Sequence, residues 1–340
     1  MLKISFLAKK NGEKKAFVNN ITISLIFIVS LTINFLIVSF LTPHTINFIV
    51  FPFDIFMISF IVTFLPFFYL LILKEKRKTN QLEVIVHLAL KELPLKYDIY
   101  RKLTHLVVLA IILFYFTLGF LVKNFFVYLL NFFPPIISDI FYSVYSIEKN
   151  PMIFTQYLVV FLVGISLIGL LTAEFVRILK PKLYPLKPVN QILREEELHM
   201  RLGPQISTAV GCFSIIVLYG LFQPIGPLII CTSMTMAIFG DIASNLIGRT
   251  VGNKYKYIRG TKKTYIGLIA GIIAAFFSGI IILILLCEFY NISLLGLIFL
   301  PLIGAIIIGI LDYVDLEIDD NLTYVFVIST ILFFISFLIL

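Results

Sequence analysis

The sequence predicts an all-α, polytopic integral membrane protein. Hydrophobic residues make up 60% of the 340-residue chain and charged residues only 14%, whereas about 25% of the residues of a typical globular domain are charged. Apolar runs long enough to cross a bilayer, which takes about 20 residues, recur along the whole chain. Because a water-soluble fold cannot bury so much apolar surface, the composition excludes a soluble enzyme and a disordered chain.

The apolar runs predict nine transmembrane helices. They lie near 21–42, 47–73, 103–122, 152–176, 205–222, 226–248, 264–287, 293–311 and 322–340. The apolar stretch 124–136 is short and ends in two prolines, so it either lengthens the third span or lies in the membrane interface. We divide the chain into a two-span N-terminal extension with a basic loop (1–99) and a seven-span core (100–340).

The distribution of positive charge predicts the orientation. Cytoplasmic loops of membrane proteins are rich in lysine and arginine, and 25 of the 27 such residues fall in the segments 1–20, 74–102, 177–204, 249–263 and 312–321. We therefore expect a cytoplasmic N-terminus and assign the net charge of +8 to these loops, not to a nucleic-acid partner. Since no loop is long enough for a soluble domain, we expect any chemistry at the cytoplasmic membrane face.

The sixth predicted span carries the strongest candidate site. Asp241 is followed by Ser244, Asn245 and Gly248 at i+3, i+4 and i+7, so these residues share one helical face. A carboxylate at the centre of a span costs about 2.5–3.5 kcal/mol and usually faces a bundle interior or a wet cavity. The stripe predicts a ligand or ion site. Alternatively, Gly and Ser serve a helix–helix contact and Asp241 pairs with a basic residue.

The loop after this span is strongly basic. Residues 249–264 include six cations, among them Arg249, Lys262 and Lys263, before a helix begins at Thr264. Cations, a flexible backbone and a helix N-terminus together suit a phosphate group. The alternative is ordinary cytoplasmic loop charge.

The segment 312–321 has the opposite composition. It holds five carboxylates and no cation, and clustered carboxylates suit Mg²⁺, which commonly joins one or two of them to substrate phosphates. Alternatively, Asp319, Asp320 and Asn321 only cap the final helix.

Two weaker patterns lie on the same predicted side of the membrane. Arg101 precedes His105 by four residues at the start of the third span. Glu174 with Arg177, and the run 194–197, are typical of ion pairs on a helix surface. Since all these charged groups fall at one face, they indicate a complex of Mg²⁺ and a polyanion, and phosphoryl or nucleotidyl transfer to a lipid.

The order of these motifs resembles the polyprenol kinase family, which contains dolichol kinase, phytol kinase and the CTP-dependent diacylglycerol kinase. The motifs are Arg101-Lys102-x-x-His105, Glu174-x-x-Arg177, Arg194-Glu195-Glu196-Glu197, Gly240-Asp241-x-Ala243-Ser244-x-x-Gly248-Arg249-x-x-Gly252, Gly260-x-Lys262-Lys263-Thr264-x-x-Gly267 and Asp319-Asp320-Asn321-Leu322-Thr323. The resemblance covers about residues 100–340. It departs at Ile266, where the family often has a Glu, and at Asp312, which stands where a Glu is usual.

The resemblance implies a kinase that transfers the terminal phosphate of a nucleotide, usually CTP, to the hydroxyl of a membrane alcohol such as dolichol, polyprenol or phytol. It places Asp241 and the segment 262–264 in the nucleotide-binding region. It also matches Asp319 and Asp320 to the closing acidic motif and His105 to the basic motif.

From these residues we expect the following roles. Mg²⁺ is held by Asp241, Asp319 and Asp320, and the catalytic groups are Asp241, Asp320 and His105, of which a carboxylate or the histidine accepts the hydroxyl proton. The CTP contacts are Arg249, Lys262, Lys263, Thr264 and Asn245, with Gly252 and Gly260 allowing close approach. The partners are therefore an isoprenoid alcohol, a nucleoside triphosphate and the bilayer. The sequence does not predict the oligomeric state.

Two other functions remain open at the level of the sequence. A cytidylyltransferase that forms a CDP-lipid would share CTP, Mg²⁺ and an acidic cluster, but its closing Asp-Arg-x-Asp run is not present. A cation-coupled transporter would use the intramembrane Asp241 as its coupling group.

Overall fold

The computed structural model describes residues 1–41, 50–79, 99–102, 105–144, 152–252, 256–258, 261, 263–314 and 316–339. In these residues the regular structure is helical, apart from one isolated antiparallel bridge between Tyr257 and Thr264. The helices are α1 (Leu2–Lys10), α2 (Lys14–Leu41), α3 (Phe53–Thr79), η1 (Leu106–Leu109), α5 (Ala110–Phe116), α6 (Leu118–Leu130), α7 (Pro135–Val144), α8 (Met152–Leu179), η2 (Pro181–Leu183), η3 (Lys187–Ile192), α9 (Glu195–Leu198), α10 (Pro204–Tyr219), α11 (Ile225–Thr250), α12 (Tyr265–Leu286), α13 (Leu294–Val314) and α14 (Asp320–Ile339). The predicted all-α architecture is thereby confirmed.

Among the described residues, eight helices are long and apolar enough to cross a membrane. They are α2, α3, the segment 99–116, α8, α11, α12, α13 and α14. The predicted span at 205–222 corresponds to α10, which is apolar but has only 16 residues. The first half of the apolar stretch 124–136 forms the end of α6, and α7 begins at Pro135. These helices support a polytopic membrane protein.

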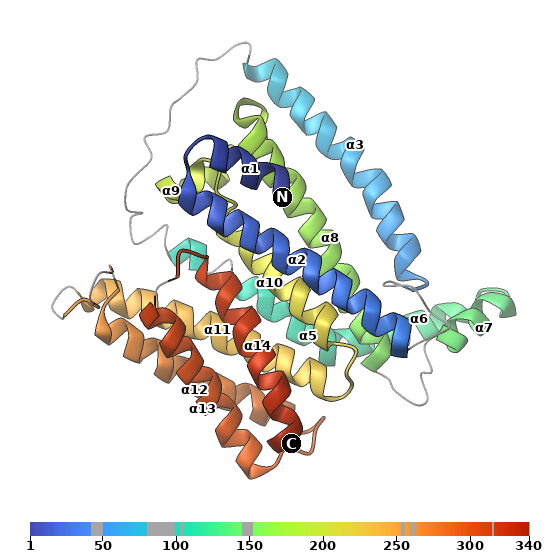
Figure 1. Cartoon of the computed structure of the whole chain (residues 1–340). Coiled ribbons are helices and arrows are strands. Elements are labelled where there is room, and N and C mark those ends of the chain that lie inside the picture. Colours follow the sequence, from blue (N-terminus) through green and yellow to red (C-terminus); the bar gives the residue numbers. More distant parts are fainter. Residues whose placement is uncertain are drawn as a thin grey trace.

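The spans differ greatly in how far the rest of the protein covers them. In the most apolar 18 residues of α11, 83% of the residues are buried inside the protein, whereas the same share in α3 is 6%. Figure 1 shows α3 at the edge of the bundle, beside α8, while α11 runs through its middle. Helix α10 is also enclosed, because it packs against α2, α8 and α14. The centre of the fold is therefore made by α10 and α11.

Helices α11 and α12 cross with almost no space between their backbones. Gly240, Ser244 and Gly248 of α11 face Gly267 and Gly271 of α12. A Cβ atom added to Gly267 would lie 2.7 Å from the Ser244 carbonyl oxygen, and one on Gly271 would lie 3.1 Å from the Gly240 carbonyl oxygen. Small residues permit such approach between membrane helices. Ser244 and Gly248 thus serve the helix–helix contact that was the alternative to a ligand site.

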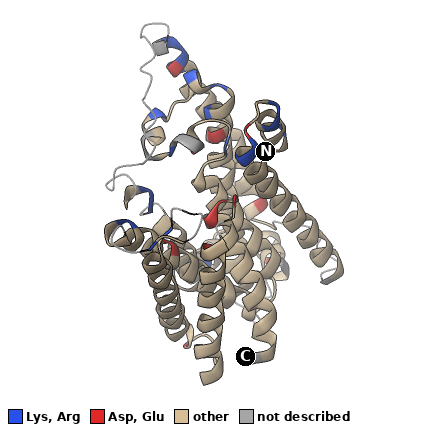
Figure 2. Ribbon diagram, turned by 60° about the vertical axis from the view of Figure 1, so that its left-hand side comes forward, with Lys and Arg blue, Asp and Glu red and all other residues tan. Residues whose placement is uncertain are grey.

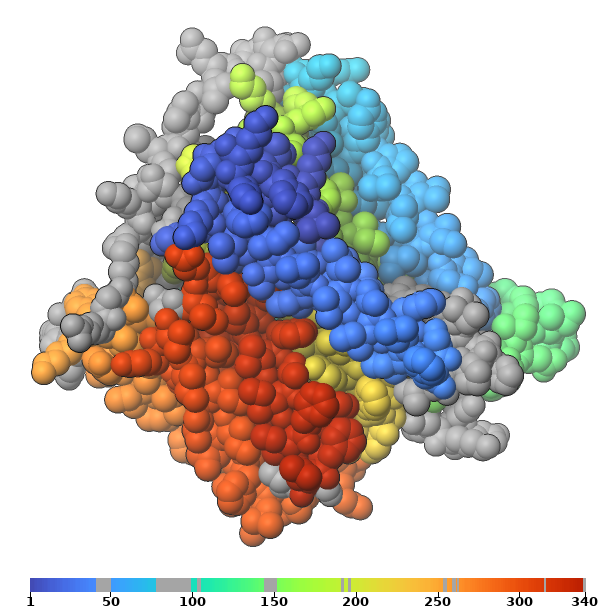
Figure 3. Space-filling view, in the orientation of Figure 1, coloured from blue at the N-terminus to red at the C-terminus, as the bar shows by residue number. Residues whose placement is uncertain are grey.

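Charged side chains gather in one half of the molecule. Figure 2 shows lysine, arginine, aspartate and glutamate in its upper half, while the helical ends near the C-terminus are almost free of them. In the space-filling view of Figure 3, α1 and α2 lie next to the start of α14, so segments far apart in the sequence are neighbours there. The candidate site lies in this charged half.

Candidate functional site

Asp241 lies on α11 in a buried ion pair with Lys102, which belongs to the segment that precedes α5. Both side chains are more than nine-tenths buried. The Asn245 amide, one turn further along α11, donates 2.7 Å to Asp241 Oδ1 and 2.9 Å to the Asp241 carbonyl oxygen. The predicted pairing of Asp241 with a basic residue is therefore present, and Lys102 provides the cation.

The end of α13 contributes a second carboxylate, Asp312, which is buried. Ser244 Oγ and the Tyr324 hydroxyl each donate to it at 2.9 Å, one from α11 and the other from α14. Lys263 Nζ lies 2.9 Å from Asp312 Oδ1 and 3.0 Å from Asp320 Oδ2, so it bridges two carboxylates. These bonds join α11, α13, α14 and the end of the basic loop.

Asp319 immediately precedes α14 and caps it. Its Oδ1 atom accepts hydrogen bonds from the Asn321 backbone N–H at 3.0 Å and from the Asn321 amide at 2.6 Å. This is the capping role that the sequence offered as an alternative for the acidic motif. Among the described residues, Asp319 forms no ion pair with a lysine or arginine, although its side chain is buried.

The described residues on the two sides of the segment 259–262 bond to each other just before α12. The Ile258 N–H donates 2.8 Å to the Lys263 carbonyl oxygen, and Thr264 Oγ1 then caps α12 by accepting from the Gly267 N–H. A Cβ on Gly252 would lie 2.7 Å from Thr264 Oγ1, which explains a glycine there. Arg249 lies in the last turn of α11. The predicted site residues Lys262 and Gly260 lie outside the described part of the chain.

His105 is buried close to the same charges. Asp241, Lys102 and Asp319 all act electrostatically on its imidazole. Its Nε2 atom is buried and has no hydrogen-bond partner among the described residues. A buried imidazole nitrogen without a partner is unusual in a folded protein, so His105 has bonding capacity left for another molecule.

Arg177 and Glu174 do not lie on a helix surface, as their spacing suggested, but are buried. Arg177 Nε and NH2 donate to the two oxygens of Glu174 at 2.8 and 2.6 Å. The remaining donors bind the carbonyl oxygens of Glu197, Leu198 and Arg201. An arginine has five N–H donors, and all five are used. This pair organises the loop between α8 and α10, and the prediction of a surface pair was wrong.

Glu197 connects this loop to the site. Its Oε1 atom lies 3.2 Å from Arg101 NH1, and its Oε2 atom accepts from the Arg194 N–H at 2.9 Å. Burial raises the pKa of the Glu197 carboxyl, and the neighbouring Arg101 opposes this effect without cancelling it. Arg101 is thereby fixed next to Lys102, the partner of Asp241.

We call Asp241, Asp312, Asp319 and Asp320 the acidic cluster. Within the described residues, two lysines, Lys102 and Lys263, form ion pairs with three of these four carboxylates. No group of three or more His, Cys, Asp or Glu side chains is arranged to hold a metal ion in the described part of the chain. Mg²⁺ commonly needs only one or two protein carboxylates beside substrate phosphates, so Asp319 with a neighbouring carboxylate fits that role.

Sequence reasoning missed several participants. Lys102 was noted only as part of a motif, although a cation at the start of a span next to an intramembrane aspartate is a signal that could have paired them. Tyr324 and Asn19, which bind Asp312 and the Asp319 backbone, give no local signal because their partners are set by helix packing.

Comparisons of the chain with protein-family models, with curated proteins and with solved structures gave no match.

Proposed function

We propose that the protein is a membrane lipid kinase that transfers the terminal phosphate of CTP to the hydroxyl of an isoprenoid alcohol. One observation carries the proposal. The sequence singled out Asp241, Lys263 and the pair Asp319–Asp320 in three separate segments, and these segments meet in one charged cluster that is buried at Asp241 and Asp319 and partly exposed at Lys263 and Asp320. A triphosphate and a divalent cation are the ligands that such a mixture of carboxylates and lysines suits.

In this proposal Asp319 and Asp241 would hold the metal, and Lys263 and Lys102 would neutralise the phosphate oxygens. Mg²⁺ would supply neutralisation of the charge on the transferred phosphoryl group. Lys263 is suited to this role because it already bridges two carboxylates and keeps about a quarter of its side chain exposed. Asn245 keeps Asp241 oriented through its 2.7 Å hydrogen bond.

The transfer forms a bond between the alcohol oxygen and the terminal phosphorus, while the bond from that phosphorus to the bridging oxygen breaks. CDP leaves, and the hydroxyl proton passes to His105 Nε2 or to a carboxylate of the acidic cluster. His105 is suited because its Nε2 atom is buried and has no partner in the described residues. Positioning and charge neutralisation supply most of the catalysis in such reactions.

The proposal includes the finer topology. Nine spans, with α10 as the short fifth one, place the N-terminus and the acidic cluster at the cytoplasmic face. The lysine-rich loops support this orientation.

Transfer from labelled CTP to a panel of polyprenols, dolichol and phytol by the reconstituted full chain tests the proposal. We expect a labelled lipid monophosphate and CDP from the wild type, and at least about a 100-fold loss in Asp319→Asn, the upper end of what losing an outer partner of a metal costs. Asp319→Asn is preferred to Asp241→Asn because the latter leaves Lys102 buried without its partner. Release of pyrophosphate in place of CDP would identify a cytidylyltransferase, and no reaction with any alcohol would refute the proposal.

Cation-coupled transport is the second candidate, and the buried Lys102–Asp241 pair favours it. An ion pair between membrane helices is a common coupling device in transporters. Uptake of a cation into proteoliposomes that lack nucleotide, abolished by Asp241→Asn, would support transport against the kinase.

A further inference from the structure

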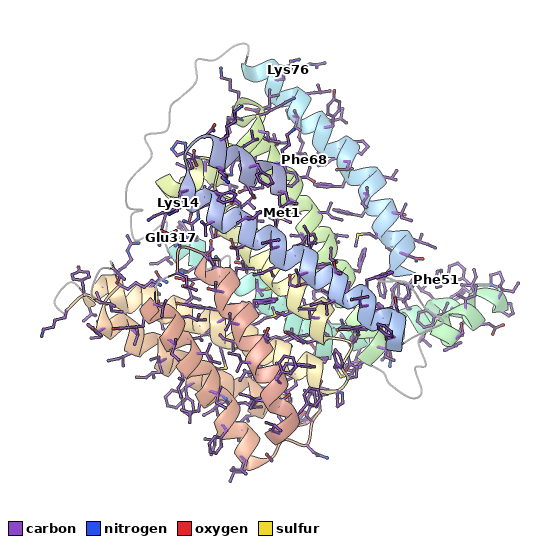
Figure 4. All side chains as sticks on the ribbon, in the orientation of Figure 1. Met1, Lys14, Phe51, Phe68, Lys76 and Glu317 are labelled. Carbon is purple, nitrogen blue, oxygen red and sulfur yellow. The ribbon has the colours of Figure 1, made fainter. Side chains whose placement is uncertain are left out.

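Two adjacent asparagines at the start of α2 reach across the fold to both sides of the candidate site. Asn19 and Asn20 are fully buried. Asn19 Oδ1 accepts a 2.9 Å hydrogen bond from the Asp319 backbone N–H, 300 residues away in the sequence. Figure 4 shows the same neighbourhood, with Lys14 at the start of α2 close to Glu317 just before α14.

Asn20 makes a matching contact with the loop before α10. Its amide donates 2.8 Å to the Met200 carbonyl oxygen, and its Oδ1 atom accepts 2.9 Å from the Leu202 N–H. Asn20 thus both donates a hydrogen bond to the main chain of this loop and accepts one from it. The next residue, Gly203, donates its N–H to Glu174 at 2.6 Å. Asn20 therefore ties α2 to the loop that Arg177 organises and that carries Glu197 to Arg101.

The Asn19 contact fixes the main chain of Asp319, whose carboxylate has few protein partners. Asp319 has no ion pair among the described residues, and its side chain is held only by Asn321, which lies in the helix that Asp319 itself caps. The position of the Asp319 main chain is thus set from outside α14 by Asn19. Because the Asp319 N–H requires an acceptor, the contacting atom is the amide oxygen.

We infer that the first span is part of the site and that Asn19 is a positioning residue for Asp319, with Asn20 holding the opposite wall. Asn19 acts on the bound metal and phosphate through Asp319 and does not touch the reacting atoms. The inference rests on the proposed function for its catalytic consequence, while the positioning itself is independent of it. The N-terminal extension is then not separable from the core.

The test compares three variants of the full chain. Asn19→Ala removes the acceptor, and Asn19→Asp keeps an acceptor oxygen in the same place. Asn34→Ala is the matched control, because Asn34 is also a buried asparagine of α2 that donates to a carbonyl oxygen, that of Val217, far from the acidic cluster.

Amide hydrogen exchange over Asp319–Thr323 gives the first readout, since it reports local opening. We expect faster exchange in Asn19→Ala, near wild-type exchange in Asn34→Ala, and recovery of protection in Asn19→Asp. Equal exchange in Asn19→Ala and the wild type would overturn the inference, whatever the activity.

Kinetics give the second readout. We expect Asn19→Ala to lower kcat by about 10–100-fold, as for other partners of metal ligands, with the KM for the alcohol unchanged and more Mg²⁺ needed for half-maximal rate. Asn34→Ala should leave the Mg²⁺ requirement unchanged. An Asn19→Ala enzyme with the wild-type Mg²⁺ requirement would overturn the catalytic part. A wild type that transfers no phosphate would instead refute the proposed function, and the exchange result would still decide the positioning.

Discussion

Among the described residues, the charged side chains around Arg177 and those of the acidic cluster differ in how completely their charges are matched. Around Arg177 every donor has a protein acceptor, and Glu174 takes up the Gly203 N–H as well. The acidic cluster has more carboxylates than lysines in the described residues and leaves His105 Nε2 without a partner. A buried network that is fully bonded fixes structure, whereas one with unused capacity has room for a ligand. We therefore expect the first group to stabilise the fold, and the second is the candidate for function.

Loss of Arg177 should have the largest effect on stability. Arg177→Met leaves Glu174 buried without its partner and frees three carbonyl oxygens, and breaking a buried pair costs about 3–5 kcal/mol. We expect a strongly lowered midpoint of thermal unfolding in detergent. The double variant Glu174→Gln with Arg177→Met should recover part of the loss. A single variant as stable as the wild type would remove the contrast between the two groups.

Lys102→Met should cost somewhat less, because Asn245 still binds Asp241. The sharper expectation is its response to MgCl₂. A ligand at about 100 times its dissociation constant stabilises by about 2.7 kcal/mol, so Mg²⁺ should raise the unfolding midpoint of Lys102→Met. The same salt should raise that of Arg177→Met less, because this variant keeps Lys102 paired with Asp241. Equal responses of the two variants would show that removing Lys102 does not make Asp241 more available to a divalent cation.

Glu197 links the two groups, and its effect should depend on pH. Because burial raises its pKa above the ordinary value of 4.5, the native state keeps this proton to a higher pH than the unfolded chain does. Its contribution to stability is fully present below pH 4.5 and is lost as the pH rises through the native pKa. In Glu197→Gln, unfolding midpoints measured across this range should lack that decline. An unchanged decline would assign it to another group.

Asp319→Asn should have the smallest effect on stability, within about 0.5 kcal/mol, since asparagine caps a helix as well as aspartate does. The same variant should nevertheless lose phosphate transfer. Thermal unfolding and the transfer assay, applied to one preparation, check both statements. A large loss of stability would mean that the Asp319 carboxylate stabilises the fold, as the pair of Arg177 and Glu174 does.

Much of the fold could be predicted because helices and spans leave periodic, local signals. The start of α12 at Tyr265, capped by Thr264, and the acidic start of α14 at Asp320 both fell close to their predicted places. The length of α10 was not predicted correctly, since the predicted span at 205–222 extends past Tyr219, where that helix ends.

The site was predictable only in part. Asp241, Lys263 and Asp320 could be selected because charge in an apolar chain is costly. The partners Asn19 and Tyr324 could not, because an uncharged polar residue in a helix has no distinguishing pattern until tertiary packing brings its partner near. Glu174 and Arg177 were misjudged for the same reason, as their i,i+3 spacing is identical on a surface and in a core.

The close crossing of α11 and α12 has a consequence for how a ligand enters. Not even a methyl group fits between Gly267 and the Ser244 carbonyl oxygen without a shift, so the crossing leaves no room for a ligand between these two backbones. Lys102 pairs with Asp241 of α11, and Asp320 at the start of α14 pairs with Lys263 just before α12. In the proposed function, a nucleotide or a lipid headgroup would therefore reach the acidic cluster past Lys102 or past the start of α14, and the crossing would form the wall on the other side.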